Sequence, residues 1–199
     1  PMFLKKHLQC AKFREKRTIG IIGANRGAGA TYTGMLLASY FGIENKIRTA
    51  FLECNNHGDF DRLQDAFEWS REDKRTFSFD RITFFKKVAS NEIPEIMSDY
   101  YECYILDFGT DYVSWKDEFI RCGLKIIVGD RALWNQLKTA ALVKSLENIR
   151  GSENWIYIIP YANKKILKGI SSKTGKYFIK INYKTDYTLL SKETIKLFD

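Results

Sequence analysis

The sequence lacks the features that would place the chain in a membrane or export it. No apolar run approaches the roughly 18 to 20 residues that span a bilayer, and the first residues lack the charge-then-apolar order of a secretory signal. The chain has only three prolines, no obvious linker and no internal repeat. We therefore expect one compact protein in the cytoplasm, without a transmembrane segment.

Cysteine and histidine are also too few and too scattered to suggest a metal site. The four cysteines form no C-x-x-C pair, and the sequence has only two histidines. Spacings of this kind are typical of free thiols in a reducing compartment. Metal binding through sulfur is therefore not expected.

Positive charge and aromatic side chains are plentiful. The chain has 45% hydrophobic and 15% aromatic residues, enough for a core, and its formal net charge is +8. Such a charge favours polyanions or an anionic surface, although a plain lysine-rich solvated surface gives the same pattern. Residues 1–17 form a basic lead-in segment, within which Phe3 to Lys16 are compatible with a short amphipathic helix.

Apolar runs alternate with helical patterns along the rest of the chain. Five runs predict strands: Thr18 to Ile22, Arg48 to Glu53, Cys103 to Phe108, Leu124 to Val128, and Trp155 to Ile159. Three patterns predict helices: Thr31 to Phe41, Ala132 to Ile149, and Ser191 to Phe198. Continuous apolar strands between helices predict an α/β fold, a doubly wound and mostly parallel sheet with helices on both faces. Residues 70–88 break this rhythm and indicate either an irregular strand pair or a surface insertion.

A glycine-rich turn joins the first predicted strand to the first predicted helix, in the stretch TIGIIGANRGAGATYTG. Gly27 and Gly29 allow the backbone to approach an oxyanion, and the N–H groups from Ala28 to Tyr32 would point toward it. In open α/β sheets the first strand-turn-helix is the usual phosphate site. The turn is therefore a candidate phosphate cradle, and a purely structural corner is the alternative.

Compared with the pattern G-x-x-x-x-G-K-[ST], the turn is incomplete. It keeps the second glycine as Gly29 and the hydroxyl as Thr31, but it has Ala24 for the first glycine and Ala30 for the lysine. The amides are retained and the fixed cation is lost. Arg26 is the candidate that restores charge, because guanidinium binds phosphate oxygens bidentately.

A second interpretation starts from the segment GANRGAG, which resembles the cofactor turn of short-chain dehydrogenases. The Y-x-x-x-K pair of that family is matched by Tyr161 and Lys165. The context differs, because Tyr161 follows Pro160 at the end of an apolar strand, whereas the family places the pair on a long helix.

The stretch YYECYILDFGTD distinguishes these interpretations. It is an apolar strand that ends in Asp107, the arrangement of a Walker B strand whose carboxylate supports magnesium. With the glycine-rich turn and the strand RTAFLECNNHGDF, it resembles the deviant P-loop ATPases of the MinD/ParA group, including the TadZ/CpaE-like members with a degenerate P-loop. The resemblance spans Thr18 to Phe198 and implies that residues 18–199 form a P-loop NTPase-like domain with three layers.

This resemblance implies a nucleotide site for ATP or ADP with Mg²⁺. Thr31 and Asp107 correspond to the metal positions, and Asn163 lies where the group often contacts adenine. The nucleotide-binding candidates are Asn25, Arg26, Gly27, Ala28, Gly29, Ala30, Thr31, Tyr32 and Asn163. The alternatives are an ordinary helix cap for Thr31, a capping carboxylate for Asp107 and a turn residue for Asn163.

The expected function is that of a regulatory or positional switch. Because Asn25 and Ala30 replace the two characteristic lysines, the resemblance implies weak or absent ATP hydrolysis. It also implies a homodimer, nonspecific DNA binding through basic surfaces and a protein partner that the sequence does not identify. Two alternatives are a pseudo-ATPase scaffold that needs no nucleotide and an NADP-dependent reductase.

Overall fold

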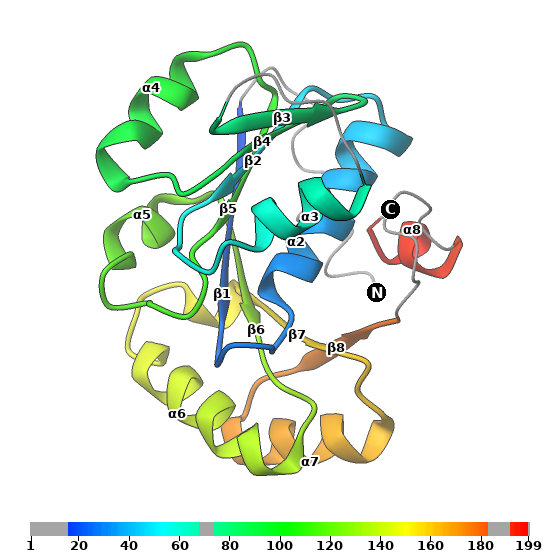
Figure 1. Ribbon diagram of the computed structural model, residues 1–199. Coiled ribbons are helices and arrows are strands. Elements are labelled where there is room, and N and C mark those ends of the chain that lie inside the picture. The colour runs from blue at the N-terminus through cyan, green and yellow to red at the C-terminus, as the bar shows by residue number, and fades with distance from the viewer. Residues whose placement is uncertain (1–15, 68–73, 183–191, 199) are drawn as a thin grey trace.

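The computed structural model describes residues 16–67, 74–182 and 192–198, and within them a single sheet of eight strands forms the centre (Figure 1). The strands are β1 (Arg17–Gly23), β2 (Thr49–Glu53), β3 (Thr76–Phe79), β4 (Ile82–Phe85), β5 (Cys103–Asp107), β6 (Leu124–Val128), β7 (Ile156–Pro160) and β8 (Phe178–Ile181). Their spatial order is β3-β4-β2-β5-β1-β6-β7-β8. Neighbours are parallel except for β3 and β4, which are antiparallel.

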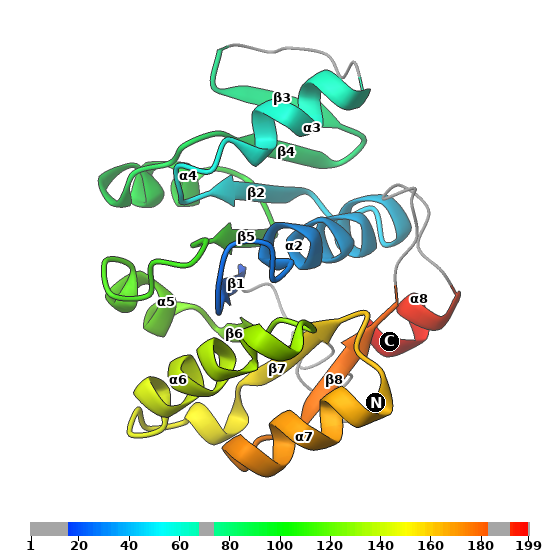
Figure 2. The same cartoon turned by 60° about the horizontal axis from the view of Figure 1, so that its bottom comes forward.

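Helices cover both faces of the sheet, which gives three layers (Figure 2). One face carries α2 (Ala30–Ala38) with its π-helical continuation η1 (Ser39–Glu44), α3 (Asp59–Phe67) and α8 (Lys192–Phe198). The other carries α4 (Ile93–Ser98), α5 (Lys116–Arg121), α6 (Gln136–Leu146) and α7 (Lys164–Thr174). Short 3-10 turns, η2 (Ser90–Glu92), η3 (Leu133–Asn135) and η4 (Ser152–Asn154), precede α4, α6 and β7. The predicted doubly wound α/β fold is confirmed.

The central strands are buried on both faces, as their continuous apolar sequences require. Every residue of β2, β5 and β7 is buried, whereas β4 alternates between buried and partly exposed positions and the edge strand β3 has a single buried residue. The turn between β3 and β4 places Asp80 at a φ of 53°, a left-handed conformation that Asp adopts more readily than most residues. The irregular stretch of the sequence is therefore a strand pair that extends the sheet, because β4 pairs with β2.

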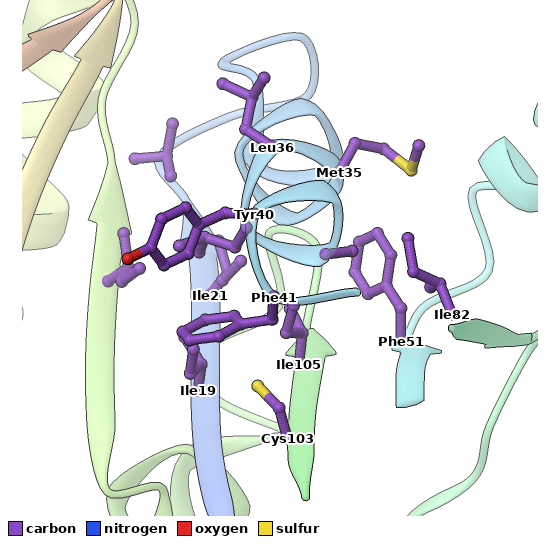
Figure 3. Close-up of a cluster of buried hydrophobic side chains, with 14 of the residues drawn as sticks. Ile19, Ile21, Met35, Leu36, Tyr40, Phe41, Phe51, Ile82, Cys103 and Ile105 are labelled. Atoms are coloured by element: carbon purple, nitrogen blue, oxygen red, sulfur yellow. The ribbon is translucent and has the colours of Figure 1, made fainter. Parts of the chain in front are cut away.

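The core on the α2 face is built from side chains of the helix and of the strands beneath it (Figure 3). Met35 and Leu36 of α2 are buried against the layer formed by Ile21 and Ile105. Phe51 of β2 is fully buried at the edge of this layer, beside α2. Packing of α2 on the central strands fixes the place of the loop that precedes the helix.

The five predicted strands are present as β1, β2, β5, β6 and β7, each within one residue of the expected bounds. The first predicted helix corresponds to α2 with η1, and the second to η3 with α6. The third corresponds to α8, although its predicted cap Ser191 lies outside the described residues, as does the predicted lead-in helix except for Lys16. The division into a segment 1–17 and a domain 18–199 stays a prediction.

Candidate functional site

The glycine-rich loop (residues 24–29) lies at the carboxyl edge of the sheet, between β1 and α2. Strand β1 is central and pairs with β5 on one side and β6 on the other, so the direction of chain progression changes around it. Crevices at such a point are the usual ligand sites of open α/β sheets. A cavity of about 540 Å³ opens here, and its lining includes seven of the predicted nucleotide-binding residues: Asn25, Arg26, Gly27, Gly29, Ala30, Thr31 and Tyr32.

Two glycines give the loop its shape. Gly27 and Gly29 have φ of 84° and 103°, values that side chains with a Cβ rarely adopt. A Cβ on Gly29 would also lie 3.0 Å from Cγ of Pro160. The first bond at the start of α2 is made by the amide of Thr33 to the carbonyl of Gly29, so the amides that precede it have no partner within the helix. A loop of this kind presents N–H groups and the positive end of a helix dipole to an anion.

Ala28 differs from its neighbours in the loop. Its amide donates to the carbonyl of Asn25 at 3.1 Å, and its side chain is buried outside the cavity lining. Ala28 therefore closes the turn from behind. The amides on either side of Ala28 are therefore the candidates for anion binding.

Thr31 and Asp107, the two predicted metal positions, are brought into direct contact. Oγ1 of Thr31 donates to Oδ2 of Asp107 at 2.6 Å, and the amide of Gly109 donates to Oδ1 at 3.0 Å. Asp107 ends β5 and is fully buried, while Thr31 lies in the first turn of α2. Residues 76 positions apart in the sequence thus form one polar centre at the base of the cavity.

A third carboxylate, that of Asp59, completes this centre. Oγ1 of Thr31 lies 3.3 Å from Oδ2 of Asp59, whose other oxygen accepts from Arg62 at 2.6 Å. Asp59 begins α3, and its amide donates to the buried carboxylate of Glu53 at 2.7 Å. Glu53 therefore positions the start of α3, whereas Asp59 is the acidic side chain that faces the cavity.

Burial controls the protonation of the two strand-end carboxylates. Loss of solvent raises the pKa of Asp107 above its ordinary value, and the hydrogen bond from Thr31 lowers it in part. Burial likewise raises the pKa of Glu53, against the opposing effect of the backbone amides that it accepts. A divalent cation beside Asp107 would remove this penalty, because it favours the ionised form.

The donors at the base of the cavity suit Mg²⁺. This cation prefers oxygen ligands and usually takes one or two from the protein and the rest from water and substrate phosphates. The hydroxyl of Thr31 and the carboxylates of Asp107 and Asp59 are such donors. In the part of the chain that the structure describes, no group of three or more His, Cys, Asp or Glu could hold a metal alone. A cation here would therefore depend on a ligand that supplies further oxygens.

Several residues of the cavity were not predicted as site residues from the sequence. His57, Arg62, Gly109 and Thr110 line it together with Asp59. Cε1 of His57 lies 3.0 Å from the position that a Cβ on Gly109 would take, so the imidazole packs on the loop after β5. The resemblance offers Glu53 or Asp59 as the acidic residue after the second strand, and the structure places Asp59 in the cavity lining. The segment NNHGDF could also have indicated His57, since it follows a buried strand that ends at the same edge as Asp107.

Asn25 connects the glycine-rich loop to the loop after β6. Its Nδ2 donates to Oδ2 of Asp130 at 2.7 Å, and Nδ2 of Asn135 donates to the same oxygen at 2.7 Å. The other carboxylate oxygen accepts from the amide of Ala132 at 2.8 Å. Oδ1 of Asn25 is buried without a hydrogen-bond partner. The side-chain amide of Asn25 is therefore held by Asp130 toward the loop after β6.

Asn163 and Tyr161 lie beside the site, at the end of β7. Oδ1 of Asn163 accepts from the amide of Ile166 at 2.9 Å, so this side chain caps α7. Its contact with a base stays a prediction. Tyr161 precedes α7 and stacks on Tyr32 with ring centroids 5.9 Å apart, whereas Lys165 belongs to the helix. The tyrosine and lysine of the dehydrogenase-like pattern therefore do not share a helix.

The buried charge of Asp107 predicts a pH-dependent effect on stability. Because the folded-state pKa is raised, the protonated carboxyl of Asp107 stabilises the folded protein relative to the ionised form. This stabilisation is fully present below the unfolded-state pKa of about 3.8 and is lost as pH rises through the folded-state pKa. Relative to the native chain, Asp107→Asn should therefore become progressively more stable as pH rises through that window. Urea unfolding of both proteins at a series of pH values measures the difference.

Asp111 provides a control with the opposite sign. Hydrogen bonds from Ser114 lower the pKa of Asp111 below 3.8, so the ionised carboxylate stabilises the folded protein. This stabilisation develops as pH rises toward 3.8. Asp111→Asn should then lose stability relative to the native chain over that acidic range. Parallel pH profiles for the two variants would contradict the assignment of Asp107 as a buried, unfavourable charge.

Comparison with known proteins supports the fold independently. No protein-family model and no curated protein matches the sequence. Among solved structures, the chain is similar to a ParA family ATPase from Chlorobium tepidum TLS, with a TM-score of 0.62 at 15% identity over 87% of this chain and 86% of that one. It is also similar to a Borrelia burgdorferi B31 protein assigned to plasmid partition and bound to AMPPNP, with a TM-score of 0.61 at 13% identity over 92% and 95%.

A third similar structure is the septum site-determining protein MinD from Pyrococcus horikoshii OT3 in complex with Mg-ADP. Its TM-score is 0.58 at 12% identity, over 92% of this chain and 95% of that one. Identities this low establish the fold alone. In the described residues, no helix has the length and apolar character needed to cross a membrane. The sheet topology and these structural similarities together show that the chain has the P-loop NTPase-like fold of the MinD/ParA ATPases.

Proposed function

We propose that this chain is a nucleotide-binding switch of the MinD/ParA type, a relative of the TadZ/CpaE-like members with a degenerate P-loop. It would hold ATP or ADP with Mg²⁺ in the cytoplasm and hydrolyse ATP weakly or not at all. The observation that carries the proposal is the 2.6 Å contact between the buried Asp107 and Thr31, which lines the same cavity as the glycine-rich loop. The two solved structures with AMPPNP and Mg-ADP bound support the choice of ligand.

Each part of the cavity has a role in this proposal. The amides around Gly27 and Gly29 would bind the phosphates, and Thr31 would contact the metal. Asp107, whose pKa is raised by burial, would become ionised and support the metal through water. Mg²⁺ would supply charge neutralisation at the phosphate oxygens. Asp59 lies where it could orient a water molecule.

Weak turnover follows from the cations that the loop lacks. Ala30 and Asn25 stand where lysines would stabilise the charge that develops on the transferred phosphoryl group. Arg26 is exposed at the rim of the cavity, and Arg62 is paired with Asp59 at 2.6 Å. Neither is fixed as a lysine in the loop would be. A second copy of the chain, facing the first, would be needed to add a cation to the site.

Titration with fluorescent ATP, with and without Mg²⁺, tests the proposal. We expect saturable binding that strengthens when Mg²⁺ is present. Absence of ATP binding under both conditions would instead favour a scaffold that needs no nucleotide. Tight NADPH binding without ATP binding would favour the reductase interpretation.

Ala30→Lys should strengthen nucleotide binding. A charge-assisted hydrogen bond to phosphate contributes about 1.5 to 3 kcal/mol, which corresponds to a gain of roughly tenfold or more in affinity. Lys138→Ala, at an exposed position of α6 outside the cavity, is the control variant for a general change of charge, and Lys138→Arg, which keeps the charge, is the control for substitution at that position. If the affinity of Ala30→Lys does not change, the loop does not cradle phosphates.

A further inference from the structure

A group of exposed apolar side chains lies at the start of α6, and we call it the apolar knob (Leu133, Trp134 and Leu137). Their exposed fractions are 67%, 81% and 71%. None of them lines the cavity at the glycine-rich loop or the second cavity between α4 and α5. The knob is therefore a projection, and its large apolar surface is unusual for positions open to water.

Helix α6, which begins at this knob, and its neighbour α7 carry exposed lysines. Helices α6 and α7 lie side by side in both views (Figures 1 and 2), and their contact places Oε1 of Gln136 4.0 Å from the position of a Cβ on Gly169. We call their exposed lysines the basic face: Lys138, Lys144, Lys164, Lys165, Lys168 and Lys173.

The segment that contains the basic face is strongly basic as a whole. Residues 131–182 contain ten lysines and arginines against two glutamates, an excess equal to the net charge of +8 for all 199 residues. Within the described part of the molecule, none of the six lysines of the basic face forms an ion pair. The partner of this surface should therefore be anionic.

The combination of knob and basic face limits the kind of partner. A second copy of the chain would bring two surfaces of the same charge together, which is unfavourable. Duplex DNA would pair with the lysines, but it would leave the two leucines without a role. The headgroup region of an anionic bilayer uses both features, because Trp is stable at the membrane boundary and cations gain energy near anionic lipids.

We propose that the apolar knob and the basic face form a docking surface for an anionic phospholipid bilayer. Trp134 with Leu133 and Leu137 enters the boundary between headgroups and acyl chains. The lysines of α6 and α7 lie over the headgroups. This attachment is peripheral and reversible, because only one turn of helix enters the lipid.

Flotation with lipid vesicles tests the proposal on the full chain without nucleotide, so that its outcome is separate from that of the nucleotide titrations. Vesicles of equal parts phosphatidylglycerol and phosphatidylcholine should carry the protein to the top of the gradient, and pure phosphatidylcholine vesicles should not. Binding should weaken as salt is raised, because screening reduces the attraction between exposed charges. The tryptophan emission should shift to the blue on binding.

Variants separate the two contributions. Trp134→Ala should lower partitioning about tenfold, from the loss of buried apolar area. Lys164→Gln with Lys168→Gln should lower it by about fivefold for each lysine. Trp134→Phe should bind nearly as well as the native chain but lose most of the blue shift. Tyr100→Ala and Val113→Ser, which alter apolar side chains that are each 85% exposed elsewhere, should have no effect.

Four results would overturn the proposal. The first is absence of flotation with anionic vesicles, and the second is equal flotation with neutral ones. The third is tight binding to duplex DNA that Trp134→Ala leaves unchanged, with no lipid binding, which would assign the basic face to nucleic acid. The fourth is a dimer in solution that Trp134→Ala converts to a monomer, which would assign the knob to a contact between copies.

Discussion

Replacing Thr31 by alanine is expected to abolish the gain in nucleotide affinity that Mg²⁺ provides. The hydroxyl is the proposed direct metal contact, and it is held toward Asp107 at 2.6 Å. Loss of a partner in the outer shell of a metal site typically costs 10 to 100-fold, so loss of a direct contact should cost about 100-fold. Fluorescent ATP titrations at fixed Mg²⁺ and in chelator measure the effect.

The control for this prediction is Thr31→Ser, which keeps the hydroxyl and should bind within a few-fold of the native chain. Binding in chelator should be similar for all three proteins, because the amides of the loop are unchanged. A thermal melt confirms that the alanine variant is folded, since Asp107 loses its side-chain donor. An undiminished Mg²⁺ effect in Thr31→Ala would show that the metal assignment is wrong.

Replacing Phe51 by alanine is expected to cause a large loss of stability. Its ring is fully buried, packs against Phe60 with centroids 4.7 Å apart and lies 5.8 Å from the ring of Phe84. Removal of a buried Phe side chain costs about 3 to 5 kcal/mol in the free energy of unfolding. Urea denaturation should show this as a lower midpoint with an unchanged slope.

Two further variants show that the cause is the cavity left in the core. Phe51→Leu fills part of the space and should cost clearly less than the alanine variant. Tyr100→Ala, at a position 85% exposed, should change the free energy of unfolding by at most about 0.5 kcal/mol. A small cost for Phe51→Ala would mean that α2 and β2 collapse onto the vacant volume, and the core would then be less rigid than the packing indicates.

The sequence alone was sufficient to predict the layered fold, because its signals are local. Continuous apolar runs identify strands buried on both faces, and their alternation with helical patterns requires a parallel sheet. Shorter elements were not predicted. Helices α4 and α5 have six residues each, and β8 has four, so their patterns are too short to stand out from the flanking loops.

The candidate site was predicted in part for the same reason. Gly27, Gly29 and Thr31 belong to one continuous stretch with a recognisable spacing, and Asp107 ends an apolar strand. His57 and Arg62 carry no such local signal. They reach the cavity because β2 and β5 are neighbours in the sheet, with Glu53 opposite Asp107.

The sequence by itself determined that a glycine-rich loop follows the first strand, since backbone conformation there depends on Gly27 and Gly29, which are close together in the chain. Only the tertiary structure decided which side chains surround that loop. Asp130 holds Asn25 from 105 residues away, and Thr31 meets both Asp107 and Asp59. Contacts between distant residues depend on strand order and helix packing, which the whole chain fixes together and no single segment encodes.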